Sequence, residues 1–140
     1  MNGRNLIGAV MALAVLLVGC GTSPTNSSSL QGARWVLVTL EGKSPLTGTA
    51  PSAGFSADQI SGSAGCNTYF GTYEVSGSEF SISDLAVTEM WCMEPEGVMD
   101  QEMDYLAALS SVATYEINRD TLTLRDTQGL QLLIFRAIEQ

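Results

Sequence analysis

The chain has 140 residues, enough for one domain, and its formal net charge is −9, with 15 acidic residues, 6 basic residues and no histidine. This balance argues against a nucleic-acid-binding protein, which gathers Lys and Arg, and against electrostatic docking on anionic lipid. Without histidine the chain cannot supply a Ser/His/Asp triad or a Cys/His zinc site, so neither a metal nor a cofactor is expected.

The N-terminus has the pattern of a secretory signal peptide, which we assign to residues 1–19. Arg4 precedes an apolar run at residues 6–18, and Gly19 and Cys20 follow it. A short basic start, a 7–15-residue apolar centre and small residues at the cleavage site are typical of such signals. The run is too short for a membrane-spanning helix of about 20 residues. Its extreme N-terminal position argues against the alternative of a buried core helix.

Residues 17–20, Leu-Val-Gly-Cys, resemble the lipobox of bacterial lipoproteins. The resemblance implies cleavage before Cys20 and acylation of Cys20 with three chains, which hold a membrane far more firmly than one. Gly21 stands where Asp would favour inner-membrane retention, which implies the periplasmic face of an outer membrane. The mature chain keeps five basic and all fifteen acidic residues, a formal net charge of −10. Residues 20–32, rich in Ser and Thr, are expected to form a tether.

Export leaves two cysteines after acylation, Cys66 and Cys92. An even pair in an oxidising compartment predicts a disulfide. The alternative is a pair of buried free thiols.

The remaining chain, residues 33–138, predicts one mainly β (α+β) domain. Extended pieces are indicated at 34–40, 55–60, 69–75, 79–83, 85–92, 113–118, 121–125 and 130–138, and residues 41–51 form a Gly/Pro-rich loop. One helix is expected from about Pro95 to Ser111, with its packing face formed by Met99, Met103, Leu106 and Leu109 or Ser110. Short antiparallel strands with one covering helix favour a small closed or half-open barrel.

Over about residues 33–137, the chain resembles the META domain (HslJ-like) family. The matching pieces are the segments 35–37, 62–73, 88–92, 122–124 and 133–135, together with Phe55, Glu102 and Gly129. The resemblance implies a small barrel-like fold and links to heat shock, novobiocin tolerance, motility or secretion, with no established enzymatic activity. Glu89 departs from the family pattern, because many relatives carry a basic residue there.

The stretch 61–73 is the most distinctive motif. Gly62, Gly65, Asn67 and Gly71 shape a tight turn around Cys66, because glycine and asparagine tolerate left-handed backbone conformations. Cys66 is a poor nucleophile, since no histidine and no nearby cation lowers its pKa. Thr88 belongs to the second family motif.

Glu102 is the acidic residue of most interest, because it falls on the apolar side of the predicted helix. We expect its carboxylate to accept hydrogen bonds from backbone N–H groups or from Asn67 in the turn, since a carboxylate on a packing face needs partners. The alternative is a position at the rim, where the carboxylate reaches water. The other acids of the helix start, such as Glu94 and Glu96, suit the helix dipole better than acid–base chemistry.

Five apolar residues are candidates for a binding groove: Trp35, Tyr69, Tyr73, Met90 and Trp91. The alternative is that they fill the barrel. The leading hypothesis is a monomeric, non-enzymatic, lipid-anchored envelope domain that binds a protein component of stress response, antibiotic tolerance, secretion or assembly. A carrier of a small apolar ligand in the barrel mouth is the alternative, and an enzyme is third.

Overall fold

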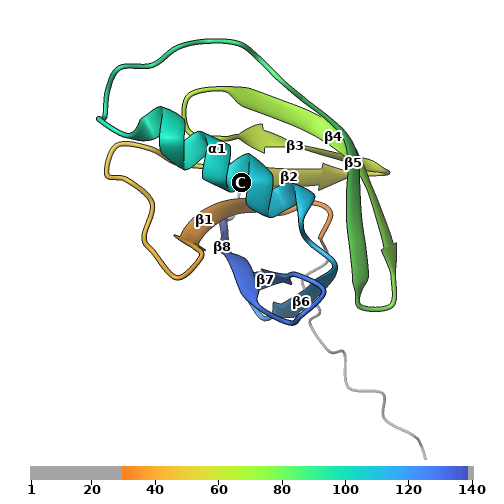
Figure 1. Cartoon of the computed structure of the whole chain (residues 1–140). Coiled ribbons are helices and arrows are strands. Elements are labelled where there is room, and N and C mark those ends of the chain that lie inside the picture. Colours follow the sequence, from red (N-terminus) through yellow and green to blue (C-terminus); the bar gives the residue numbers. More distant parts are fainter. Residues whose placement is uncertain (1–29, 139–140) are drawn as a thin grey trace, which may run out of the picture.

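The computed structural model describes residues 30–138 and shows eight antiparallel strands with one helix (Figure 1). The elements are β1 (Arg34–Leu40), β2 (Ser52–Ser56), β3 (Gln59–Ser63), β4 (Thr68–Ser76), β5 (Glu79–Val87), α1 (Val98–Ser110), β6 (Thr114–Asn118), β7 (Thr121–Arg125) and β8 (Gln131–Ile138). Each strand pairs with the next, and β8 pairs with β1 to close the ring. The predicted mainly β fold, with one helix before the last three strands, is confirmed.

Alternating side chains place the interior of the ring. In β4, Tyr69, Gly71 and Tyr73 face inward, while Phe70 points outward and is 59% exposed. This is the two-residue periodicity expected of a strand with one buried face. The interior is filled with side chains, and Trp35, Tyr69, Tyr105 and Phe135 are among the largest that are fully buried.

The strands differ from the sequence prediction at two places. The predicted piece at 55–60 is a hairpin, in which Ala57 has a φ of 50° in the turn between β2 and β3. The piece at 79–83 and residues 85–87 of the next piece are one strand, β5, with a register shift against β4 near Asp84, whose φ is 54°, while residues 88–92 belong to the loop that follows. Positive φ at Ala57 and Asp84 follows from the tertiary pairing, and neither residue signals it in the sequence.

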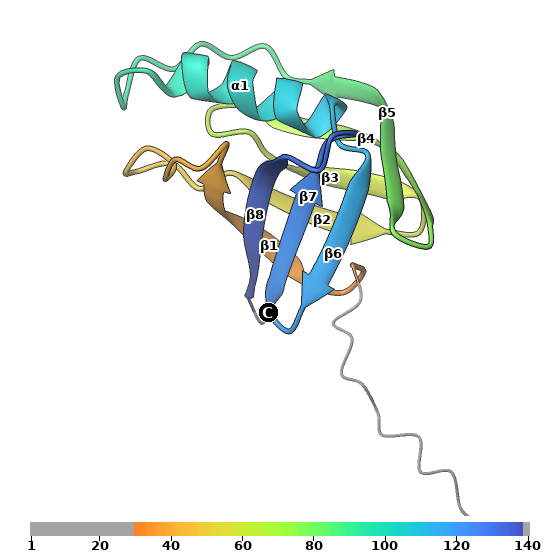
Figure 2. The same ribbon diagram turned by 60° about the horizontal axis from the view of Figure 1, so that its bottom comes forward.

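Helix α1 lies across one end of the ring (Figure 2). It begins at Val98, after Gly97 in a left-handed conformation, and therefore later than the predicted start at Pro95. Its buried residues are Val98, Gln101, Glu102, Tyr105, Ala108 and Leu109.

The predicted packing face of α1 is wrong in part. Met103 is 63% exposed, and Met99 and Leu106 are only partly buried. The buried face is instead turned toward Gln101, Glu102 and Tyr105. An apolar pattern cannot identify a packing face whose buried members include a glutamine and a glutamate.

The chain enters the domain before β1. Leu30, in the segment predicted as tether, is buried, and its carbonyl accepts a hydrogen bond of 3.1 Å from Trp35 Nε1. The signal peptide at 1–19, Cys20 and the tether as far as residue 29 lie outside the described residues. Within residues 30–138, no helix is long and apolar enough to cross a membrane.

Candidate functional site

The glycine-rich turn between β3 and β4 depends on close backbone contact. A Cβ at Gly62 would overlap the carbonyl oxygen of Ser52, and a Cβ at Gly71 would lie 2.9 Å from the carbonyl oxygen of Ser83. Gly65 has a φ of 123°, which side-chain-bearing residues rarely adopt. These glycines let β2, β3 and β5 approach the turn.

Glu102 of α1 binds this turn. Its side chain is buried in a residue only 4% exposed, and Oε2 accepts hydrogen bonds from the backbone N–H groups of Cys66 (3.0 Å) and Asn67 (2.6 Å). Oε1 accepts a third bond, of 2.6 Å, from Asn67 Nδ2. The structure therefore has the contacts expected of a packed carboxylate, and not the water-exposed rim position.

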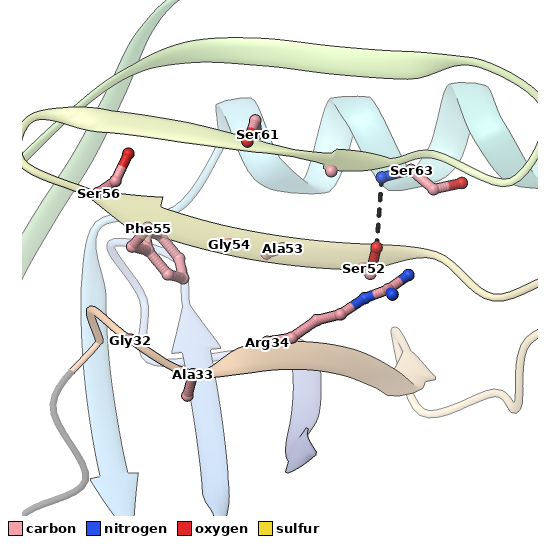
Figure 3. Close-up of a pocket in the computed structure, with 11 residues that line it drawn as sticks. Gly32, Ala33, Arg34, Ser52, Ala53, Gly54, Phe55, Ser56, Ser61 and Ser63 are labelled. Atoms are coloured by element: carbon pink, nitrogen blue, oxygen red, sulfur yellow. Dashed lines mark hydrogen bonds between the residues drawn. The ribbon is translucent and has the colours of Figure 1, made fainter. Parts of the chain in front are cut away.

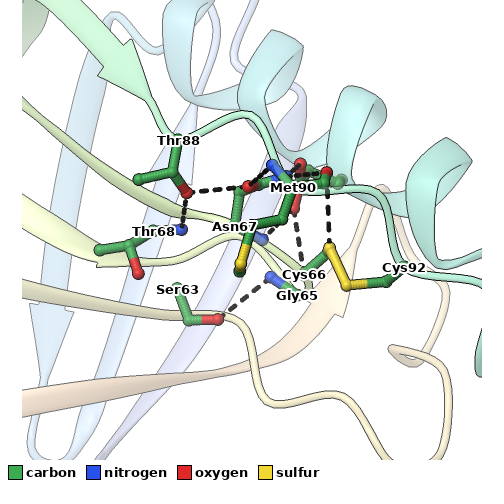
Figure 4. The surroundings of a disulfide bond; sticks show 9 residues. Ser63, Gly65, Cys66, Asn67, Thr68, Thr88, Met90 and Cys92 are labelled. Atoms are coloured by element: carbon green, nitrogen blue, oxygen red, sulfur yellow. Dashed lines mark hydrogen bonds between the residues drawn. A yellow bond between two sulfur atoms is a disulfide. The ribbon is translucent and has the colours of Figure 1, made fainter.

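Asn67 connects the turn to the segment 88–97 between β5 and α1, which we call the 88–97 loop (Figure 4). Its Oδ1 accepts bonds from the Thr88 hydroxyl (2.8 Å) and the Met90 N–H (2.7 Å), and its Nδ2 donates to the Met90 carbonyl (3.0 Å). The Thr88 hydroxyl in turn accepts from the Thr68 N–H. One buried amide thus joins a turn, a loop and a helix.

A disulfide adds a covalent link between the same two segments. Cys66 and Cys92 are bonded, with a Cα–Cα distance of 5.9 Å, and the predicted pairing is confirmed (Figure 4). With Asn67 holding Met90 and the disulfide holding Cys92, both neighbours of Trp91 are fixed to the turn.

A pair of buried tyrosines connects the helix to the sheet below the turn. The hydroxyls of Tyr69 and Tyr105 lie 3.0 Å apart, and both approach the carbonyl oxygen of Ser52, at 2.9 and 3.2 Å. Burial raises the pKa of both phenols, so they stay neutral and act as hydrogen-bond donors at ordinary pH.

Gln101 is a contact that sequence reasoning missed. Its Oε1 accepts from the Leu46 N–H (2.6 Å) and its Nε2 donates to the Thr49 hydroxyl (3.0 Å), which ties α1 to the loop after β1. Ser52, the shared acceptor for the tyrosines, was also missed. Neither residue carries a local signal, because each matters only through a partner that lies far along the chain.

The five residues predicted as a groove do not come together. Trp35, Tyr69 and Tyr73 are buried in the interior, in agreement with the alternative prediction that they fill the barrel. Met90 and Trp91, in contrast, are 56% and 78% exposed. The predicted groove is therefore wrong as a single site. Strand alternation separates its members, because inward residues fill the ring while the 88–97 loop runs outside it.

The exposed members form a distinct surface. Met93 is 80% exposed on the same loop, and Met103 projects from α1 next to Glu102. Successive residues on a helix are 100° apart, so Met103 projects from the Glu102 flank of α1 and not from its buried face. We call Met90, Trp91, Met93 and Met103 the Met–Trp surface.

A separate hollow lies on the outer side of β1, β2 and β3 (Figure 3). It has a volume of about 410 Å³, and its floor is made of glycine, alanine and serine, with the Arg34 side chain extending along it toward Ser52. The hollow is open to solvent. Among residues 30–138 no group of three or more Cys, Asp or Glu side chains is arranged to hold a metal ion.

Comparison with known proteins agrees with this architecture. The chain matches the family model described as the META domain over residues 28–139. The heat shock protein HslJ of Escherichia coli (strain K12) is 30% identical over 95 residues, which cover 64% of this chain and 67% of that protein. A solved NMR structure is 28% identical with a TM-score of 0.61, covering 76% of this chain and 90% of its own.

A second NMR structure, of a protein from Burkholderia xenovorans, has a TM-score of 0.65 at 22% identity and covers 99% of both chains. At that identity the likeness concerns the fold alone. Together with the family match over most of the sequence, these findings place the chain in the META domain family.

Proposed function

We propose that this chain is a non-enzymatic, lipid-anchored domain of the bacterial envelope that works by binding a protein through the Met–Trp surface. The observation that carries the proposal is the fixed exposure of Trp91. Its two chain neighbours are held by the Asn67 hydrogen bonds and by the disulfide, yet its own side chain is 78% exposed. A large apolar side chain presented by a rigid loop binds a partner with little loss of conformational freedom.

Residue types in the surface support this use. Tryptophan is enriched among the residues that dominate binding energy at protein interfaces. Methionine is flexible and polarisable, so its side chains adapt to a partner's shape. Three exposed apolar side chains within four residues of one loop, Met90, Trp91 and Met93, exceed the scattered single apolar residues that ordinary surfaces carry, and Met103 is also exposed on the helix that follows.

The filled interior weighs against the alternative of a small-ligand carrier. Trp35, Tyr69, Tyr105 and Phe135 occupy the ring, and α1 covers one end of it. The hollow of Figure 3 lies on the outside of the sheet and is lined mostly by small residues, with Phe55 as its one large apolar side chain, so it offers little apolar surface to a ligand.

The relative named heat shock protein HslJ supports a role in envelope stress response. The lipobox-like residues 17–20 support export and anchoring through Cys20. Tolerance to novobiocin-type antibiotics and a part in secretion or assembly are the further roles that the family resemblance suggests.

Site-specific photocrosslinking in the native envelope tests the proposal. A photoreactive amino acid replaces Trp91 in one variant and Asp58, exposed in the β2–β3 turn away from the loop, in a matched control. We expect a reproducible protein adduct from position 91 and none from position 58. Equal labelling from both positions, or no adduct from position 91, would contradict the proposal.

A further inference from the structure

The charge of this domain is distributed unevenly along the sequence. Between Lys43 and Arg119 there is no lysine or arginine, whereas the same span holds eleven acidic residues. It includes β2 to β5, the 88–97 loop and α1. The described chain has five basic residues: Arg34 on β1, Lys43 in the turn after β1, Arg119 in the β6–β7 turn, Arg125 on β7 and Arg136 on β8.

Acidic side chains border the Met–Trp surface. On the loop, Glu89, Glu94 and Glu96 are exposed, and on α1, Asp100 and Asp104 are exposed on either side of Met103 in the chain. The ion pairs found in the structure, Arg125–Glu116 and Arg136–Asp120, involve none of these five. Lys43 lines the same small hollow as Asp104, whereas Glu89, Glu94 and Glu96 flank the exposed apolar residues of the loop directly in the chain.

We propose that the Met–Trp surface binds a cationic amphipathic segment of a partner protein. This inference rests on the proposed function and names the chemistry of the partner. Apolar side chains of the segment pack on Trp91 and Met93, and its Lys or Arg side chains pair with the acidic border. Charges at the rim of an interface steer association and select partners, while the apolar centre supplies most of the affinity.

A lipid surface is a poorer occupant than a cationic protein segment. Anionic headgroups would be repelled by the five exposed carboxylates. The loop and α1 also lie at the end of the domain away from the orange segment, where the described chain begins (Figure 2). An anchor that precedes the described chain would bring the end opposite to the loop and α1 toward the membrane.

Selection of peptides tests the chemistry directly. Random 12-residue peptides on phage are selected against the wild-type protein in neutral detergent. Bound clones are compared with those retained by a serine variant that carries Met90→Ser, Trp91→Ser and Met93→Ser. We expect selected peptides to combine Lys or Arg with aliphatic or aromatic residues and to lose at least tenfold in affinity for the serine variant. Enrichment of acidic or uncharged peptides, equal binding to the variant, or no enrichment at all would overturn the inference.

Charge variants separate the acidic border from the net charge. A border variant carries Glu89→Gln, Glu94→Gln and Glu96→Gln, and a matched control removes three exposed charges elsewhere, by Asp58→Asn, Glu74→Gln and Glu79→Gln. At 0.1 M ionic strength exposed charges act over roughly 10 Å, so we expect the selected peptides to bind the border variant at least fivefold more weakly and the control like wild type. Equal weakening of both variants would refute a specific border.

The two proposals fail differently. A crosslinked protein at position 91, together with selected peptides that lack basic residues, would leave the binding function standing and refute the cationic partner. Vesicles of phosphatidylcholine with and without phosphatidylglycerol give the remaining comparison: a shift of Trp91 fluorescence on vesicles without a response to the selected peptides would assign the surface to lipid and refute the inference.

Discussion

Replacement of Glu102 is the most direct test of the buried contacts that hold the 88–97 loop. Glu102→Ala leaves three N–H groups without an acceptor, namely the backbone N–H groups of Cys66 and Asn67 and one of the two N–H groups of the Asn67 side-chain amide, whose other N–H donates to Met90. Hydrogen bonds to a charged group contribute about 1.5–3 kcal/mol each, and water can reach part of the vacated space, so we expect a loss of about 4 kcal/mol. For a domain of this size, that corresponds to a fall in Tm of roughly 15 °C or more.

Glu102→Gln gives a smaller and more specific effect. The amide keeps one oxygen, which can accept from the two backbone N–H groups, but its NH₂ then faces Asn67 Nδ2. Rotation of the Asn67 amide would relieve this conflict only by breaking its bonds to Thr88 and Met90. We expect a loss of about 2 kcal/mol, the cost of a buried donor without a partner.

Thermal and urea unfolding of the intact, oxidised protein provide the measurement. Asp104→Asn is the matched control, because it removes a carboxylate from the same helix at an exposed position, and we expect it to stay within about 0.5 kcal/mol of wild type. If Glu102→Ala and Glu102→Gln both unfold like the control, the carboxylate does not support the turn, and the reasoning from its three bonds fails.

Three further results are expected. Gly62→Ala should destabilise the fold strongly because its Cβ would overlap the Ser52 carbonyl, while Gly54→Ala, whose Cβ would have no atom nearer than 3.7 Å, should stay close to wild type in urea unfolding; equal effects would contradict the packing argument. Burial raises the pKa of Tyr105, so the folded state holds its proton more tightly than the unfolded state, and stability should be complete below pH 9 and fall above about 10, with a shallower fall in Tyr105→Phe. Acrylamide should quench Trp91 emission readily and Trp35 emission hardly at all, since their exposures are 78% and 0%, and single-tryptophan variants that quench alike would refute the fixed outward position of Trp91.

Much of the fold could be predicted from local sequence signals. Alternation in β4 places Tyr69 and Tyr73 inward, and β-branched and aromatic residues mark most strands. The predictions failed where a long-range contact sets the local conformation. Asp84 takes a positive φ inside β5 because β4 and β5 shift register there. Aspartate is common in turns, so its presence in the sequence predicts a turn between two strands and not a bulge within one strand.

The site was predictable to the extent that buried polar groups need partners. The position of Glu102 on the packing side of the helix, together with unsatisfied N–H groups in a tight turn, led to the contact with Asn67. The same reasoning could not predict the contacts of Gln101, because an uncharged amide on a helix can equally well be exposed to water. It also misplaced Met103, because a methionine spaced three or four residues from other apolar residues fits a core stripe as well as an exposed surface.

The failure at Met103 bears on function. Apolar spacing assigns Met99 and Met103 to the core, whereas the structure buries Glu102 and Tyr105 and leaves Met103 exposed. Burial of Glu102 thus leaves its neighbour Met103 outside, and Asn67 and the disulfide hold the two chain neighbours of Trp91. The buried contacts that stabilise the turn therefore also determine which apolar residues reach the surface. A variant that loosens them, such as Glu102→Gln, is expected to weaken partner crosslinking at position 91 at temperatures where the domain is still folded, which a purely stabilising role for the turn would not produce.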